Sequence, residues 1–232
     1  MPSSRGVREM IERFSLKAEI SDIVGQFGVS KVMQAHQQRF NVTPISHVSI
    51  VMNDRHQQRI LQQARWGMFP FWAKDSINTT KSDIRRKPFL AELVKRNRCI
   101  IPCTGFYGVK QLGGERDPRA MHIVLPSKPL FGIAGIYDRF RNAQGREYHV
   151  FTMLTEENVG HLSDWQASLP IVLDAEGTEA WLNPQERNYE FLQMHLPILE
   201  ATSLRAYPVM NEVHNESYDV PDCIAELKID YA

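Results

Sequence analysis

Short segments in which apolar and polar residues alternate recur along this sequence, with turn-forming residues between them. Val48, Ile50 and Met52 alternate with polar neighbours, a spacing typical of a strand with one buried face. Residues 57–66 follow the polar turn at 53–55 and are expected to form the antiparallel partner of that strand. Further strands are expected at residues 99–109, 121–125, 130–140, 148–154, 169–173 and 204–210. This pattern constrains the chain to a largely antiparallel sheet.

Helical spacing lies between these strands. Ile20, Ile23, Val24 and Phe27 recur at the period of an amphipathic helix, and Gly28 is suited to end it. Further helices are expected at residues 88–97, 156–165, 178–182 and 186–194. Because helices and strands follow one another without a regular strand–helix–strand period, the sequence predicts an α+β fold. No linker-like or low-complexity tract divides the chain, which indicates one domain.

The composition excludes several classes of protein. The chain has 43% hydrophobic residues and 27 Lys+Arg against 27 Asp+Glu, unlike a disordered protein. No run of about 18 apolar residues is present, so we expect no membrane partner. Three cysteines do not make a disulfide framework, and residues 1–14 lack the apolar core of a signal peptide. We therefore expect a soluble, cytoplasmic protein, and a monomer.

The neutral total hides a division of charge along the chain. Residues 1–150 carry 24 Lys+Arg and 12 Asp+Glu, whereas residues 151–232 carry 3 and 15. Such asymmetry can attract a phosphate backbone, although two solvated faces of an ordinary domain would give the same totals. Eight basic residues fall between positions 81 and 110: Lys81, Arg85, Arg86, Lys87, Lys95, Arg96, Arg98 and Lys110.

Generic catalytic motifs are scarce. The sequence has no glycine-rich phosphate loop, no GxSxG and no HExxH. Cys99 and Cys103 have no second Cys or His pair at zinc spacing, so we expect neither a metal nor an organic cofactor. Alternation along a strand places both on one face, as buried structural cysteines. A cysteine-protease arrangement of Cys103 with His161 stays open, because nothing in the sequence positions the two groups relative to each other.

A series of segments nevertheless matches a known order of motifs. MIERFSL stands for MCGRF, RFNVTP for RYNVAP, WGMFPFWA for WGLIPSWA, and Ile77-Asn78 for the start of INARAET. RCIIPCTGFYGVK stands for RRCIVPADGFYEWK, AGIYDRF for AGLWE, FTMLTEEN for FTILTTAAN, SLPIVL for HDRMPVIL, and PVMNEVHN for a closing PV-N segment. From Arg13 to about Ile224, the chain thus resembles the SOS response-associated peptidase family, also described as abasic-site processing proteins.

The resemblance implies both a fold and a chemistry. The fold would be one α+β domain with a barrel-like, mostly antiparallel sheet surrounded by helices. It would span residues 11–232, after an N-terminal extension of residues 1–10. Members of the family capture abasic sites in single-stranded DNA through an N-terminal Cys, whose amine forms a Schiff base and whose thiol closes a thiazolidine. An Asn orients the reacting groups, a Glu and a His assist proton transfer, and aromatic and basic side chains hold the flanking strand.

The sequence departs from the family at the reactive positions. Alignment places Ile11 where the Cys stands, Gly108 where the Glu stands and Gln166 where the His stands. Isoleucine has no thiol, and the residues before it bury its amine in a peptide bond unless translation starts at Met10. Asn78 alone persists from the reactive group. The resemblance therefore implies a member without the family's crosslinking or self-peptidase chemistry, a pseudoenzyme.

Other matched positions are expected to face DNA. They are Arg13, Arg39, Asn41, Trp66, Asn78, Arg85, Arg86 and Thr155. Several have a structural alternative: Asn41 suits a turn, Trp66 suits the core, and Arg39 suits a structural ion pair.

Three functions follow. The first is recognition of single-stranded or damaged DNA without covalent capture, in the DNA damage (SOS) response. The second is an active crosslinker or autopeptidase with relocated groups, using Cys103, His161 or an N-terminal amine. The third is a non-catalytic interaction protein of phage origin.

Overall fold

The structure is a computed structural model that describes residues 11–68, 76–111, 118–141, 144–160, 162–163, 165–197 and 199–228. These residues form five α-helices, three 3₁₀ helices and 14 strands. The fold is therefore α+β, as the sequence predicts. The expected extension of residues 1–10 lies outside the described residues, so the domain boundary at residue 11 stays a prediction.

The N-terminal strand is an internal strand of one sheet, next to the edge strand. Its strand order is β14–β9–β8–β1–β3, and every pairing is antiparallel. Its strands are β1 (Phe14–Leu16), β3 (Arg39–Val42), β8 (Gly105–Lys110), β9 (Arg119–Val124) and β14 (Arg205–Pro208).

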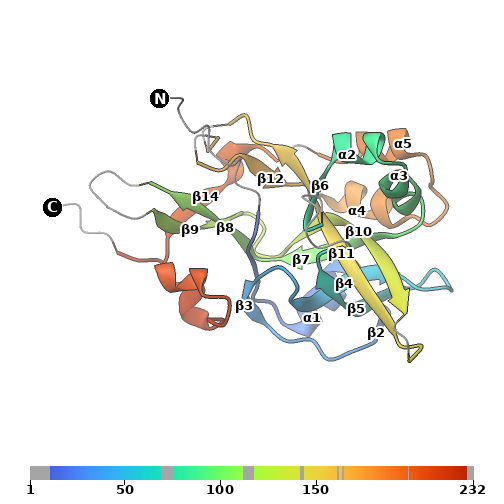
Figure 1. The fold of residues 1–232 in the computed structure, drawn as a ribbon, viewed down its shortest axis with the longest axis horizontal. Coiled ribbons are helices and arrows are strands. Elements are labelled where there is room, and N and C mark those ends of the chain that lie inside the picture. The colour runs from blue at the N-terminus through green and yellow to red at the C-terminus, as the bar shows by residue number, and fades with distance from the viewer. Residues whose placement is uncertain are drawn as a thin grey trace.

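The second sheet closes into a barrel (Figure 1). Its ring consists of β4 (His47–Asn53), β5 (Arg59–Trp66), β7 (Arg98–Cys103), β10 (Phe131–Arg141) and β11 (Glu147–Glu157). The ring closes because β5 pairs with β11 in parallel, while the other neighbours in it are antiparallel. Short strands β2 (Lys31–Val32), β6 (Asn78–Thr80), β12 (Ser168–Pro170) and β13 (Val172–Leu173) attach to it. The barrel-like, mostly antiparallel sheet is thus confirmed.

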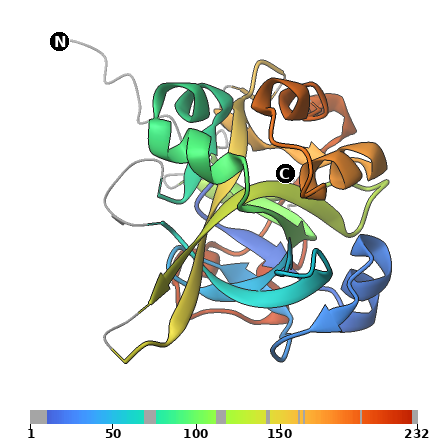
Figure 2. The same ribbon diagram turned by 90° about the vertical axis from the view of Figure 1, so that its right-hand side faces the viewer.

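Helices cover the barrel. As Figures 1 and 2 are drawn, four of them lie above it: α2 (Lys81–Arg86), α3 (Pro88–Val94), α4 (Ala175–Leu182) and α5 (Tyr189–Met194). Helix α1 (Ile20–Phe27) buries Ile23 and Phe27, and Gly28 ends it in the left-handed conformation at φ 62°. The 3₁₀ helices span Ala201–Ser203, Asn211–His214 and Pro221–Ile224. Within the described residues, no helix is long and apolar enough to cross a membrane.

Helix α2 is absent from the sequence prediction, although its start has a local signal. Thr80 accepts a hydrogen bond from the main-chain N–H of Asp83, and the Asp83 carboxylate accepts one from the N–H of Thr80. This reciprocal capping box is visible in the sequence as Thr-x-x-Asp. The helix then carries Arg85 and Arg86 in its last turn.

The predicted strand at 99–109 is wrong as a single strand. It breaks at Thr104, which lies between β7 in the barrel and β8 in the other sheet. The N–H of Thr104 donates to the carbonyl of Ser15, and its hydroxyl accepts from the N–H of Lys17. Both strands are buried almost throughout, so the apolar residues form one run across the break and the pattern does not reveal it.

The predicted helix at 156–165 is also wrong. Strand β11 continues to Glu157, and the chain then turns at Asn158. The Asn158 side chain accepts from the N–H of Gly160 and donates to the carbonyl of Gln166. These local side-chain bonds compete with a helix. The predicted strand at 169–173 likewise divides at Ile171, whose N–H bonds to Leu154 in β11 and whose carbonyl bonds to Ala134 in β10.

A buried histidine joins three strands of the first sheet. His122 on β9 is 2% exposed. Its Nε2 lies 3.0 Å from the Ser15 hydroxyl on β1, and its Nδ1 lies 2.8 Å from the Tyr207 hydroxyl on β14. Burial lowers the pKa of His122 to about 3. The imidazole is therefore neutral in the folded protein.

We expect this histidine to make the fold acid-sensitive. Its ordinary pKa is 6.5, so between about pH 6.5 and 3 the unfolded chain binds a proton that the folded chain does not. The free energy of unfolding should fall as the pH drops through that window, by up to about 1.4 kcal/mol per unit for this one proton. Urea unfolding of His122→Gln should show a shallower pH dependence than the native chain, whereas the exposed His56→Gln should not. Equal slopes for the native chain and His122→Gln would contradict this.

Candidate functional site

The chain enters its first strand alongside β8. Phe14 pairs with Phe106, and the N–H of Tyr107 donates to the carbonyl of Arg13 at 3.1 Å. Residues 11–13 therefore lead into the sheet beside the part of β8 that carries Gly108. The side chain of Ile11 is fully buried in the main core cluster. Its burial leaves a hydrocarbon where the resemblance places a nucleophile.

Asn78 holds the main chain at this position. It is the first residue of β6, which pairs in parallel with β11 through Met153. Its side-chain Nδ2 donates to the carbonyl of Ile11 at 2.6 Å. Its Oδ1 is buried, with no hydrogen-bond partner among the described residues. An acceptor is thus left over beside Ile11.

Gly108 and Gln166 occupy one small space. A Cβ built on Gly108 would lie 2.3 Å from Gln166 Oε1 and 2.9 Å from Cζ3 of the Trp165 ring. Gln166 is buried, and its Nε2 donates to the carbonyl of Ser168 at 2.8 Å. Its Oε1 has no hydrogen-bond partner among the described residues. The side chains of Trp165 and Gln166 therefore fill the space that a side chain on β8 would need.

A chain of contacts links the three substituted positions. Asn78 binds the carbonyl of Ile11, the segment after Ile11 pairs beside β8, and a Cβ on Gly108 of β8 would meet Gln166. The side chains of Ile11, Asn78 and Gln166 do not ionise in the physiological range, and Gly108 has no side chain. Two buried amide oxygens, Asn78 Oδ1 and Gln166 Oε1, have no hydrogen-bond partner among the described residues. None of these four residues carries a group that transfers protons.

Three of the residues expected to face DNA hold the C-terminal segment instead. Arg13 donates to Asn41 Oδ1 at 3.3 Å and to the carbonyl of His214 at 2.9 Å. Asn41 is buried, and its Nδ2 donates to three carbonyls of residues 213–218. Arg39 forms an ion pair with Asp219. These polar side chains hold β3 and the residue before β1 against the C-terminal segment. The contact of Arg39 with Asp219 agrees with the structural ion pair named above as an alternative role for Arg39.

Two further predicted residues are enclosed. Trp66 has no exposed surface; its ring packs edge-on against Phe14 at 5.1 Å between centroids, and its Nε1 donates to the carbonyl of Ile77. Thr155 is buried where β11 meets β6 and β12. Neither side chain offers a surface on which a base could stack.

Arg85 and Arg86 are exposed on α2, which directly follows Asn78–Thr80. Arg85 donates to Gln193 Oε1 at 2.8 Å, and Arg86 pairs with Asp83 at 2.9 Å while 72% of its side chain stays exposed. Arg85 thus has a neutral partner, and Arg86 keeps most of its guanidinium surface exposed beside Asp83.

Sequence reasoning missed Trp165 and noted Lys110 only as one of eight basic residues between positions 81 and 110. Trp165 is half-buried over Gly108, and the Lys110 ammonium lies 5.7 Å from the centre of its ring. Trp165 directly precedes Gln166 in the sequence, and this adjacency could have indicated that Trp165 lies beside the site. The incorrect helix at 156–165 concealed its place in the site.

A relocated nucleophile finds no support at Cys103. That side chain is fully buried, its Sγ donates to the carbonyl of Gly105 at 3.2 Å, and burial raises the pKa of its thiol. Buried Cys99 and Cys103 confirm the structural interpretation of both cysteines. His161, Met10 and Trp72 lie outside the described residues. Within those residues, no cluster of three His, Cys, Asp or Glu side chains could hold a metal ion.

Comparison with known proteins gives curated relatives over most of the chain. "Abasic site processing protein YoqW" of Bacillus subtilis (strain 168) is 30% identical over 226 residues, covering 93% of this chain and 99% of the relative. A protein of the same name in Bacillus phage SPbeta matches equally well. "Abasic site processing protein HMCES" of Rattus norvegicus is 25% identical over 229 residues, covering 80% of this chain and 64% of that protein.

Solved structures share the fold. A crystal structure of a protein from Bacteroides thetaiotaomicron superposes with a TM-score of 0.75 at 23% identity, covering 93% of this chain and 99% of the other. A phage-related protein from Bordetella bronchiseptica superposes with a TM-score of 0.67 at 24% identity, covering 85% and 93%. The family described as "SOS response associated peptidase (SRAP)" matches residues 10–216. The order of the motifs, the barrel and the family match over residues 10–216 agree, and the chain belongs to the SRAP family.

Proposed function

We propose that this chain recognises single-stranded or damaged DNA and neither captures it covalently nor processes its own N-terminus. One observation carries the proposal: the site around Asn78 holds buried Ile11 together with Gly108 and Gln166, none of which can act as nucleophile, acid or base. The names of the relatives, which refer to abasic sites, support a role in DNA damage. We also propose that residues 11–232 form the binding domain.

Binding would rest on charge. The exposed guanidinium groups of Arg85 and Arg86 would contact phosphates of the strand. The acidic last third of the chain, residues 151–232, carries 15 Asp+Glu and would repel DNA. We therefore expect contact with DNA at one local group of basic residues.

The experiment compares an abasic single strand with an intact one. Denaturing gels, with and without borohydride, should show no covalent adduct, while fluorescence anisotropy should show reversible binding that weakens as salt rises. A slow-migrating band would overturn the claim of lost capture. Binding that does not weaken as salt rises, or no change in anisotropy when DNA is added, would overturn the proposal of DNA recognition.

Substitution of the two exposed arginines should weaken binding. For Arg85→Gln/Arg86→Gln we expect the slope of log affinity against log salt to fall by about 1.4, because each lost phosphate contact on a single strand removes about 0.7. The exposed Arg187→Gln, outside α2, is the matched control and should keep the native slope. An unchanged slope in the double variant would place the DNA elsewhere.

A further inference from the structure

A cavity lined by arginines lies apart from Asn78 and the other residues of the candidate site, none of which lines it. Its volume is about 370 Å³. The walls come from the β4–β5 turn, the loop between α3 and β7, the β10–β11 hairpin and the end of α4. These segments are far apart in the sequence, so only the closed barrel brings them together.

Arginine dominates this cavity. Arg55, Arg96 and Arg139 line it with exposed side chains, and none of them forms an ion pair with a described residue. Arg98 adds a buried guanidinium whose hydrogen bonds go to carbonyl oxygens of residues 94, 181, 183 and 186, not to a carboxylate. The cavity therefore gathers four guanidinium groups that form no ion pair with a carboxylate of the described residues.

The two carboxylates of the cavity are already engaged. Asp54 Oδ1 accepts from the N–H groups of His56 and Gln58 within its own turn. Glu147 lies 3.6 Å from both Arg141 and His149 on the β10–β11 hairpin. Neither pairs with the arginines at the mouth.

A tyrosine hydroxyl opens into the same cavity. Tyr137 lines the cavity, and its hydroxyl has no hydrogen-bond partner in the described part of the chain. The hydroxyl is not among the fully buried polar atoms without a partner, so it is accessible and can donate to a phosphate oxygen.

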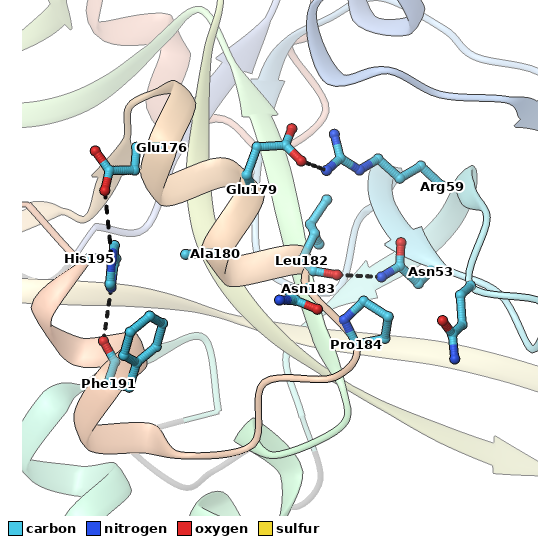
Figure 3. A pocket seen from close by; sticks show the side chains of 11 residues that line it. Asn53, Arg59, Glu176, Glu179, Ala180, Leu182, Asn183, Pro184, Phe191 and His195 are labelled. Atoms are coloured by element: carbon cyan, nitrogen blue, oxygen red, sulfur yellow. Dashed lines mark hydrogen bonds and ion pairs between the residues drawn. The ribbon is translucent and has the colours of Figure 1, made fainter.

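The neighbouring cavity shows the contrast. Figure 3 shows the cavity on the other side of Asn53, Leu182 and Pro184, residues that line both. There Arg59 is paired with Glu179, and Glu176 lies 3.7 Å from the imidazole of His195, which carries charge only when it is protonated. The arginine of that cavity is therefore engaged, whereas Arg55, Arg96 and Arg139 form no ion pair with a described residue.

We propose that the arginine-lined cavity binds a phosphate ester, supplied by a free mononucleotide or by a phosphate of a nucleic-acid backbone. Guanidinium forks match phosphate oxygens, and several donors around one anion give more than point-charge attraction. The volume lies within the range of small-ligand sites, and Met33, Leu182 and Pro184 supply apolar wall for a base or sugar. This site is additional to the proposed DNA contact at Arg85 and Arg86.

Calorimetry on the full chain tests the proposal with four probes: inorganic phosphate, deoxyadenosine 5′-monophosphate, deoxyadenosine and a short oligothymidylate. We expect the monophosphate to bind and deoxyadenosine not to bind. Arg96→Gln/Arg139→Gln should weaken binding at least about 10-fold, and Tyr137→Phe about 3-fold, the effects of losing charged and neutral hydrogen bonds. Arg187→Gln should bind as the native chain does, and circular dichroism should show every variant folded.

The probes separate the two sources. Binding of the monophosphate points to a free nucleotide; binding of the oligonucleotide alone, weakened by Arg96→Gln/Arg139→Gln, points to a backbone phosphate. The Arg85→Gln/Arg86→Gln variant should retain monophosphate binding, so failure of the proposed DNA contact leaves this readout intact. Absence of binding by all phosphate probes, or equal binding by the native chain and Arg96→Gln/Arg139→Gln, would overturn the proposal.

Discussion

Replacing Gly105 by alanine is expected to destabilise the protein by about 3 kcal/mol. The added Cβ would lie 2.3 Å from His122 Nε2, 2.6 Å from His122 Cε1 and 3.0 Å from the carbonyl oxygen of Ile123. The imidazole cannot move aside freely, because Ser15 and Tyr207 hold its two nitrogens. The clash therefore displaces either this hydrogen-bonded chain or the β8 backbone, which carries Gly108 to the candidate site.

Substitution of a second glycine, Gly25, is expected to change the stability in the opposite direction. Gly25 lies inside α1, and a Cβ there meets nothing within 4 Å. Gly25→Ala should stabilise the protein by up to about 1 kcal/mol, since alanine is the better helix former. Urea unfolding measures both variants. A Gly105→Ala protein within about 0.5 kcal/mol of the native chain would show that the sheet absorbs the clash and that His122 is not rigidly held.

Restoring the three family groups together is expected to restore covalent capture. The variant would begin at Met10 and carry Ile11→Cys, Gly108→Glu and Gln166→His. Removal of Met10 would expose an amine and a thiol on one residue, and the new Glu and His would supply acid–base groups beside it. On an abasic single strand, this variant should form an adduct that survives a denaturing gel, at least about 100-fold faster than the Ile11→Cys variant alone.

The substitutions at positions 108 and 166 have to be made together, because a side chain at position 108 would collide with the present Gln166 side chain. Because a Cβ at position 108 would meet Gln166 Oε1 at 2.3 Å and Trp165 at 2.9 Å, Gly108→Glu alone should cost about 1–3 kcal/mol of stability. Gln166→His in the same chain should recover part of that cost, a coupling measurable in a double-mutant cycle. A chain with Gly108→Glu and Gln166→His that retains Ile11 is the control for adduct formation. Adduct formation by the native chain would contradict the assignment of Ile11 as the lost nucleophile.

The local sequence predicted the elements whose signal is periodic. The stripe from Ile20 to Phe27 forms α1, and the alternating segments around the 53–55 turn pair as β4 and β5. Patterns failed where a side chain far along the chain, or a local polar bond, decides the conformation. Asn158 turns the chain where an amphipathic pattern predicts a helix, and Thr104 marks a crossing between two sheets inside one apolar run.

The candidate site divides in the same way. Motif order alone identified Ile11, Asn78, Gly108 and Gln166 as corresponding positions, because family motifs are linear. The structure then showed that Asn78 binds the carbonyl of Ile11 and that Gln166 fills the space over Gly108. It also showed Arg13, Arg39 and Asn41 bound to the C-terminal segment, more than 170 residues away along the chain.

The sequence by itself determined the fold class, the family motifs and the absence of a thiol, an acid and a base at three aligned positions. These are properties of residue type and short-range spacing, which a chain carries before it folds. Only the tertiary structure decided which cations are compensated and which remain free. Arg39 and Arg59 pair with carboxylates from distant segments, whereas Arg55, Arg96 and Arg139 line a cavity and form no ion pair with a described residue. Charge compensation depends on distances of a few ångströms between residues that the barrel brings together, and no local pattern encodes those distances.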